Sequence, residues 1–373
     1  MNIPYHKAYI EEQEIKAVIE VLKSGWLTMG PKTIEFENNF KEFLGVKNSI
    51  AVNSATSALH LALKAIGIKE GDEVIIPTNT FIATAEVVTY FNAIPVLCDI
   101  EKHTHNIDVL KLESLITDKT KAIIPVHFAG LPCDMDEILA IAKKYNLKVI
   151  EDAAHAIPAK YKGKKIGGIS DITCFSFYAT KTLVTGEGGM ATTSNADYAK
   201  CMKVNRLHGI SRDAWDRYTT GVGTWYYEVV DNGYKYNMAD MNAALGVEQL
   251  KKVEWMRDER EKIARKYAAA FKDTNVEIID IPDDRESAYH LYVIKVNNRD
   301  ELMAKLTEKG VGVSVHFIPI HKHPYYKEKY GYQDGDYHVA NKVFDRSLSL
   351  PIYPGLSDEE IDYVISKVLE FVK

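Results

Sequence analysis

The stretch CFSFYATKTLVTGEGGMATT, from Cys174 to Thr193, joins an apolar, strand-like run to a cluster of glycines, with one lysine, Lys181, between them. Most lysines are solvated surface charges, and that interpretation stays open for Lys181 taken alone. Glycines here let the backbone approach a ligand closely or adopt positive φ. A lysine held in a partly apolar site has a lowered pKa and can form a Schiff base. The stretch therefore predicts a reactive lysine where a strand ends.

Upstream of this stretch, short apolar runs alternate with helical patterns. The candidate strands span residues 49–52, 73–77, 94–100, 122–127, 148–152 and 171–177. Several are apolar on both faces, which is typical of a sheet covered by helices on both sides. Residues 57–67 and 135–145 show the amphipathic spacing of helices, and Gly67 is the expected C-cap of the first. This alternation predicts an α/β fold with a large, mainly parallel sheet flanked by helices.

Near residue 250 the sequence pattern changes. Residues 249–271 predict one long, charged, amphipathic helix, and 288–296 resemble a strand. Ser357 and Glu360 have the spacing of a capping box at the start of the last helix. We therefore expect a large domain over residues 1–250 and a smaller C-terminal α+β domain over 251–373.

Composition excludes several classes of protein. The net charge of -6 gives no basic surface for nucleic acid or anionic membrane. No stretch approaches the length of a membrane span, and the N-terminus has no apolar signal-peptide core. The four cysteines form neither a CxxC pair nor a zinc pattern, so reduced thiols of a cytoplasmic protein are expected.

Three polar stretches follow candidate strands, where open α/β sheets bind ligands. Residues 54–57 supply hydroxyls and a helix start suited to a phosphate, although plain N-capping is an equal alternative. Glu151 and Asp152 end a buried run, and a buried carboxylate needs a partner; a structural ion pair or cap is the alternative. Lys181 is the third. Together, a phosphate cradle, a carboxylate and a reactive lysine are the groups that hold pyridoxal 5'-phosphate, the carboxylate keeping the pyridine nitrogen protonated.

Seven motifs in order strengthen this interpretation. They are SGWLTMGP (24–31), NSATSALHLAL (53–63), PTNTFIATA (77–85), EDAAHA (151–156), SFYATKTLVTGEGG (176–189), GYKYNMADMNAALG (233–246) and SLPIYPGLSDEE (349–360). On these motifs the chain resembles the sugar-nucleotide aminotransferases of the DegT/StrS type, within the aspartate aminotransferase fold. The resemblance covers nearly the whole chain.

The resemblance implies roles for residues at the cofactor. Lys181 would form the Schiff base, Asp152 would pair with the pyridine nitrogen, and Phe81 would stack on the ring. The phosphate would be held by Thr56, the backbone of Ser57 and Ser176. His155 would lie near the ring hydroxyl, and Asn237 would reach the phosphate of the neighbouring subunit of a homodimer. Core packing for Phe81 and a structural role for His155 remain the alternatives.

The resemblance also implies a substrate site. Trp26, Leu27 and Thr28 would border the sugar-nucleotide cleft, and His316 and His321 would enter it from the smaller domain. A metal is not expected at the two histidines, because no third ligand is evident. The stretch VHFIPIHKHPYY (315–326) is similar to members that aminate carbon four of a hexose.

The expected activity is therefore amination of a nucleotide-linked 4-keto-6-deoxy sugar, with L-glutamate as the amino donor, for surface polysaccharide or glycan precursors. Two alternatives remain. One is a related keto-sugar dehydratase, in which histidine replaces the lysine that this chain keeps as Lys181. The other is a non-catalytic regulatory protein on the same fold, which would have no intact lysine site.

Overall fold

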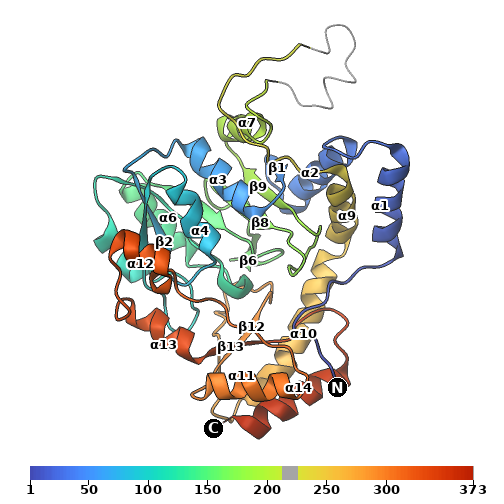
Figure 1. The fold of residues 1–373 in the computed structure, drawn as a ribbon, viewed down its shortest axis with the longest axis vertical. Coiled ribbons are helices and arrows are strands. Elements are labelled where there is room, and N and C mark those ends of the chain that lie inside the picture. The colour runs from blue at the N-terminus through green and yellow to red at the C-terminus, as the bar shows by residue number, and fades with distance from the viewer. Residues whose placement is uncertain (212–225, 373) are drawn as a thin grey trace.

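A seven-stranded sheet dominates the computed structural model, which describes residues 1–211 and 226–372 (Figure 1). Its strand order is β1-β9-β8-β5-β4-β2-β3. The strands are β1 (Asn48–Val52), β2 (Glu73–Pro77), β3 (Ile94–Cys98), β4 (Thr120–Ile123), β5 (Lys148–Asp152), β8 (Ile172–Ser176) and β9 (Gly189–Thr193). Strand β9 is antiparallel to both neighbours, and the other pairs are parallel. The predicted mainly parallel sheet is confirmed.

Helices cover both faces of this sheet, as the two-sided apolar strands predicted. The helices α3 (Ala55–Ile66), α4 (Ile82–Thr89) and α7 (Ala196–Asn205) cover one face, and α2 (Pro31–Leu44), α6 (Met135–Lys144) and α9 (Asp240–Lys251) cover the other. Successive residues of a strand point to opposite faces. Thus Val74 and Ile76 pack on the face covered by α3, α4 and α7, while Ile75 packs on the opposite face. Gly67 ends α3 at φ 82°, the expected C-cap.

A smaller antiparallel sheet lies at the opposite end of the molecule (Figure 1). Its strands are β10 (Glu277–Ile278), β12 (Tyr292–Lys295) and β13 (Ser347–Leu350), and its helices are α10 (Val253–Phe271), α11 (Arg299–Glu308) and α14 (Asp358–Phe371). Ser357 and Glu360 form the predicted capping box of α14. Ile3 bridges to Val311, so the first residues of the chain join this layer.

Two sequence expectations about elements were wrong in detail. The single helix predicted over 249–271 is interrupted, because Lys252 leaves helical conformation at φ -117° and ψ 9° between α9 and α10. The strand predicted over 122–127 is β4, which ends at Ile123. The expected domain boundary falls beside the interruption at Lys252.

The remaining elements complete the described chain. They are α1 (Glu12–Ser24), α5 (Val109–Leu112), η1 (Glu113–Leu115), η2 (Phe128–Gly130), η3 (Ile320–Lys322), α12 (Pro324–Tyr330), α13 (His338–Arg346), β6 (Lys160–Tyr161), β7 (Lys164–Lys165) and β11 (Arg285–Glu286). Although α12 and α13 are late in sequence, they return to the large sheet. Tyr326 packs in the same core as residues of α3 and α4, and Asp99 accepts hydrogen bonds from the N–H groups of Val339 and Ala340.

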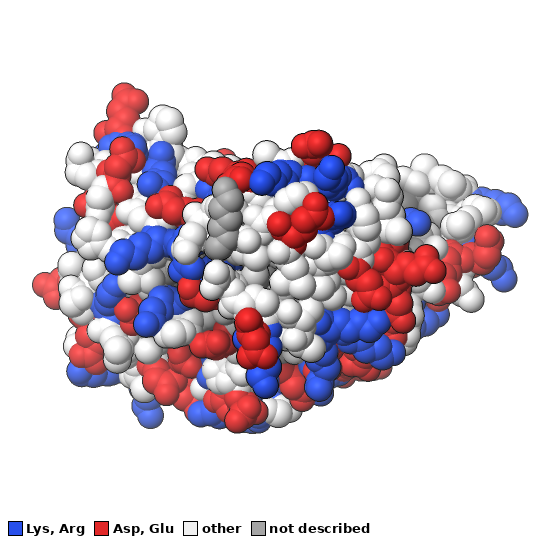
Figure 2. Space-filling view, turned by 90° about the horizontal axis from the view of Figure 1, so that it is seen from below, with Lys and Arg blue, Asp and Glu red and all other residues white. Residues whose placement is uncertain are grey.

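Charged side chains of both signs are interspersed on the face formed by the small sheet and its helices (Figure 2). Such mixing gives no large field of one sign over this face. No helix within the described residues is long and apolar enough to span a membrane.

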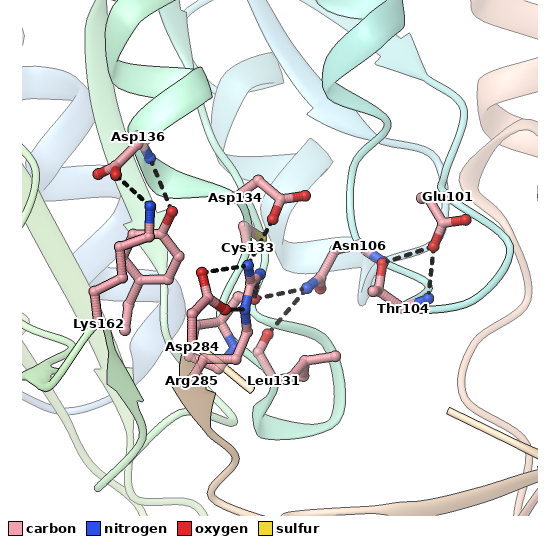
Figure 3. Close-up of polar contacts among 12 residues, drawn as sticks. Glu101, Thr104, Asn106, Leu131, Cys133, Asp134, Asp136, Lys162, Asp284 and Arg285 are labelled. Carbon is pink, nitrogen blue, oxygen red and sulfur yellow. Dashed lines mark hydrogen bonds and ion pairs between the residues drawn. The ribbon is translucent and has the colours of Figure 1, made fainter. Parts of the chain in front are cut away.

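A polar network ties the second part of the chain to the first (Figure 3). Arg285 donates to Asp134 at 2.8 Å, to Asp284 at 2.7 Å and to the carbonyl of Pro132 at 2.9 Å. The same carbonyl accepts a bond from the side-chain amide of Asn106 at 3.2 Å. These bonds hold the loop that follows η2. Removing one partner of such a buried, charged group is costly, so the loop is fixed relative to β11.

Candidate active site

A cavity of about 580 Å³ lies at the carboxyl edge of the large sheet. The N-terminal segment and the smaller sheet's loops close its other side. It collects seven of the side chains singled out by the sequence, namely Thr56, Phe81, Asp152, His155, Ser176, Lys181 and His316. They come from the ends of β1, β2, β5 and β8 and from the loop after α11, so the topology brings together residues far apart in sequence.

Lys181 lies in the loop between β8 and β9. Its backbone N–H donates to the carbonyl of Tyr178 at 2.9 Å, which fixes a tight turn after the strand. In the described part of the chain, Nζ has no ion pair within 4.0 Å. Burial lowers the pKa of the Lys181 ammonium to about 8, although the negative charge of Asp152 acts in the opposite direction. The amine is therefore partly neutral near neutral pH, the form that attacks a carbonyl.

Asp152 ends β5 with its carboxylate in the cavity wall, and 5% of the residue is exposed. Oδ2 accepts a hydrogen bond from Thr84 Oγ1 at 2.8 Å, and Oδ1 accepts one from the Ala154 N–H at 3.1 Å. Burial raises the pKa of Asp152, and these two bonds and Lys181 only partly offset that effect. A cation brought against this carboxylate would relieve the desolvation.

The N-terminus of α3 forms one end of the cavity. Ser54 caps the helix, and the N–H groups of Ala55 and Thr56 have no acceptor within it. Gly189, the first residue of β9, passes so close that a Cβ there would lie 2.5 Å from the Ser54 carbonyl. This close approach explains why residue 189 is a glycine. It also brings the hydroxyl of Ser176, paired with Gly189 across the sheet, to the same end of the cavity.

An aromatic and imidazole wall completes the cavity. Phe81 precedes α4 and is 55% exposed, so its ring faces the cavity instead of packing in the core. Phe317 lies 5.8 Å from the rings of both Phe81 and His155, between ring centroids. His316 stacks on Tyr5 at 5.7 Å, and its Nδ1 lies 2.9 Å from Ser349 Oγ. Burial lowers the pKa of His316 to about 4, so its ring is neutral at pH 7.

Six of the expected residues do not line the cavity of this chain. They are Trp26, Leu27, Thr28, Ser57, Asn237 and His321. The Ser57 N–H bonds to Ser54 Oγ at 3.1 Å, and its hydroxyl donates to Asn53. Asn237 bridges to Val52 at the edge of the sheet. The turn holding Trp26, Leu27 and Thr28 lies against the start of α9, where the Asp240 N–H donates to the Thr28 carbonyl.

Against the sequence expectation, the structure does not bring His321 into the cavity. Its imidazole is buried, with Nδ1 2.8 Å from Thr78 Oγ1 and Nε2 3.1 Å from Asn341 Oδ1. Both ring nitrogens are thus used to join the end of β2 to α13, and the histidine has a structural position.

Sequence reasoning missed several cavity residues. Tyr5, His290 and Phe317 line it from the N-terminal segment and the smaller sheet's loops, and Thr80 lines it from the end of β2. Only a folded chain brings the first three to the strand ends. Thr80 did have a local signal, since it stands in the motif that contains Phe81.

The geometry fits pyridoxal phosphate. The helix start and hydroxyls suit its phosphate, the exposed ring of Phe81 suits its flat ring, and Asp152 is a buried carboxylate without a bonded cation among the described residues. A protonated pyridine nitrogen would supply that cation. Lys181 borders the same cavity.

Comparisons with known proteins agree in family and fold. Uncharacterized protein MJ1066 of Methanocaldococcus jannaschii is 50% identical, covering 99% of this chain and 97% of the relative. Spore coat polysaccharide biosynthesis protein SpsC of Bacillus subtilis is 48% identical, and the match covers 100% of this chain and 97% of the relative. Spr1654 of Streptococcus pneumoniae, assigned as a sugar aminotransferase, is 35% identical in its PMP-form, with a TM-score of 0.93 and 98% of each chain covered. The PLP-form of the same protein is 34% identical, with a TM-score of 0.92, and the match covers 99% of this chain and 98% of that chain.

A family model matches residues 8–369, almost the entire length. The chain belongs to the DegT/DnrJ/EryC1/StrS aminotransferase family.

Proposed function

We propose that this protein is a pyridoxal-phosphate-dependent sugar aminotransferase that converts a nucleotide-linked 4-keto-6-deoxy sugar to the 4-amino sugar, with L-glutamate as amino donor. The observation that carries the proposal is the meeting of Lys181, Asp152 and the N-terminus of α3 in one cavity. The family supports the aminotransferase reaction, and the name of the Bacillus subtilis relative favours a role in making polysaccharide precursors.

Bound pyridoxal phosphate supplies a carbonyl that takes up the amino group and a ring that accepts electrons from the reacting carbon. Lys181 Nζ would attach to that carbonyl and, once freed by the donor amine, would take the proton from the donor's α-carbon. With the keto sugar bound, it would carry out the reverse proton transfer. The lowered pKa of Lys181 suits this work, because a proton carrier is most effective near the working pH.

The other groups orient the reactants. Asp152, with Thr84 and Ala154 bonded to its two oxygens, would hold the pyridinium proton in place. The free N–H groups at the start of α3 and the Ser176 hydroxyl would bind the phosphate. His316, neutral and fixed by Ser349, would bind a sugar hydroxyl.

We also propose a cytoplasmic homodimer with shared active sites. Asn237 lies outside this chain's own cavity, which is the arrangement expected if it serves a neighbour. Helix α1 exposes Ile15, Ile19 and Leu22, spaced so that all three share one face. A contiguous apolar face of this kind suits burial against a second copy. The four cysteines are free, which supports a reducing compartment.

The test is a screen of 4-keto-6-deoxy sugars linked to uridine, thymidine or guanosine diphosphate, each with L-glutamate. We expect 2-oxoglutarate and an amino sugar whose NMR spectrum places nitrogen on carbon four. Lys181→Ala should lose more than the ~10²–10⁴-fold that a general base contributes, because it also loses covalent attachment. Dehydrated sugar without nitrogen, or full turnover by Lys181→Ala, would reject the proposal.

A further inference from the structure

The segment that runs from the end of β2 into the first turn of α4 carries two hydroxyl groups bonded in series to Asp152. Thr80 Oγ1 and Thr84 Oγ1 are 2.7 Å apart, and Thr84 Oγ1 lies 2.8 Å from Asp152 Oδ2. All three residues are buried, with Thr84 fully inaccessible and Thr80 1% exposed. Thr80 and Asp152 border the cavity, whereas Thr84 does not, so Asp152 Oδ2 accepts its bond from a donor that is shielded from solvent.

The bonds have a definite direction when Asp152 is ionised. A threonine hydroxyl has one proton to donate, and a carboxylate only accepts. The proton of Thr84 is thus directed at Asp152, so the contact between the threonines requires Thr80 to donate to Thr84. Both O–H dipoles then point toward the carboxylate. Hydrogen bonds to a charged acceptor are stronger than hydrogen bonds between neutral groups, and hydrogen bonds in series polarise one another.

Other groups also act on Asp152, and any test must separate them from the hydroxyls. The Ala154 N–H bonds to the second carboxylate oxygen. The titratable groups facing Asp152 are Lys181, His127 and Cys174. The charges of Lys181 and His127 favour the ionised carboxylate, while burial raises the pKa of the Cys174 thiol and keeps it neutral.

The same segment also carries Phe81, which lies between the two threonines in the sequence. Its exposed ring faces the cavity. Thr80 and Thr84 thus anchor the segment that presents the ring-stacking side chain, and one of them holds the carboxylate. This one segment, from Thr80 to Thr84, sets the position of two groups that would contact the cofactor.

We propose that Thr80 and Thr84 form a directional hydroxyl relay that keeps Asp152 ionised and aimed at the pyridine nitrogen of the cofactor, so that Thr84 is a positioning residue. The inference rests on the proposed function for the identity of the cofactor. The relay itself is a property of this chain and can be tested without the cofactor.

The experiment compares four variants of the full chain: Thr84→Val, Thr84→Ser, Thr80→Val and the double variant Thr80→Val/Thr84→Val. Valine keeps the volume and removes the hydroxyl, and serine restores the donor, so Thr84→Ser is the matched control. The pKa of Asp152 is measured in cofactor-free protein from the infrared band of its protonated form, assigned by its loss in Asp152→Asn. The dissociation constant for pyridoxal phosphate is measured separately, and thermal unfolding shows that each variant folds.

Thr84→Val should raise the pKa of Asp152 by about one unit and weaken the binding of pyridoxal phosphate about tenfold. Both effects correspond to the loss of one hydrogen bond to a charged acceptor. Thr84→Ser should stay close to the parent protein. Thr80→Val should give a smaller shift in the same direction, and no further shift when Thr84 is already valine, because the relay is then broken. Unchanged values in Thr84→Val, or equal loss in Thr84→Ser, would overturn the proposal.

An additive effect of Thr80→Val in the double variant would also overturn the serial arrangement. Should Thr84→Val fail to fold, Thr80→Val alone must still shift the pKa of Asp152, and no shift would reject the relay. If the parent protein did not bind pyridoxal phosphate, the proposed function would fail, while the titration of Asp152 would still decide the relay.

Discussion

Lys181 and Asp152 face one cavity, and burial shifts their pKa values in opposite directions. Burial disfavours the charged form of each side chain, lowering the pKa of Lys181 and raising that of Asp152. Each group therefore gains from a ligand that offers a carbonyl to the amine and a proton to the carboxylate. Both residues were predicted from sequence, because Asp152 ends a buried apolar run and Lys181 stands between an apolar run and a cluster of glycines. The bond from Thr84 to Asp152 could not be predicted, because the two are 68 residues apart.

The pKa of Lys181 gives a testable pH dependence. Only the neutral amine attacks a carbonyl, and with a pKa of about 8 roughly one tenth of it is neutral at pH 7. In cofactor-free protein, the rate of covalent attachment of pyridoxal phosphate should rise with pH and level off above about 8. The rate is followed by absorbance after rapid mixing. Asp152→Asn is the control: removing the negative charge that raises the pKa of Lys181 should move the midpoint to lower pH. A midpoint near 10 would contradict the burial argument.

At the scale of elements, the site depends on how β9 meets α3. The sequence showed strands wherever apolar residues cluster, and it missed β9, which is short and rich in glycine and threonine. Its pairing with β1 and β8 on both sides stabilises it in spite of that composition. The break between α9 and α10 was also missed, since no proline or glycine marks Lys252.

Gly189→Ala tests the packing of β9 on α3. The new Cβ would lie 2.5 Å from the Ser54 carbonyl and 2.7 Å from the Ala55 nitrogen, so the start of α3 must move. We expect a loss of about 1–3 kcal/mol in the free energy of unfolding. Affinity for pyridoxal phosphate should fall more than affinity for pyridoxal, because only the former has a phosphate at that helix.

Gly335→Ala is the matched control, since its Cβ would meet nothing within 4 Å. Urea unfolding and fluorescence titration with both ligands provide the two measurements. Equal losses of affinity for pyridoxal phosphate and pyridoxal would show that the helix start does not hold the phosphate.

At the scale of the molecule, the cavity combines segments from the whole chain, including Tyr5 from the N-terminus and His316 from the second half. The overall fold was predictable because strand and helix periodicity is local. The opposite wall was not, since His290 and Phe317 reach the cavity only through tertiary packing. His321 shows the same limit: its bonds to Thr78 and Asn341 give it a structural position that no local pattern indicated.

A mixing experiment tests whether two copies share each site. Lys181→Ala and Asn237→Ala should each be nearly inactive as pure dimers. In a hybrid dimer, one of the two sites would combine an intact Lys181 with an intact Asn237 of the other copy, so activity should return. Differently tagged chains, unfolded together and refolded, allow hybrids to be isolated and assayed. Inactive hybrids would place Asn237 outside the neighbour's site.

The most direct test of the account is to locate the covalent attachment. Native protein, reconstituted with pyridoxal phosphate and reduced with borohydride, is digested and its peptides are sequenced by mass spectrometry. The account predicts a phosphopyridoxyl group on Lys181, and none in protein carrying Lys181→Ala. The same group on another lysine, or its absence after reconstitution, would contradict it.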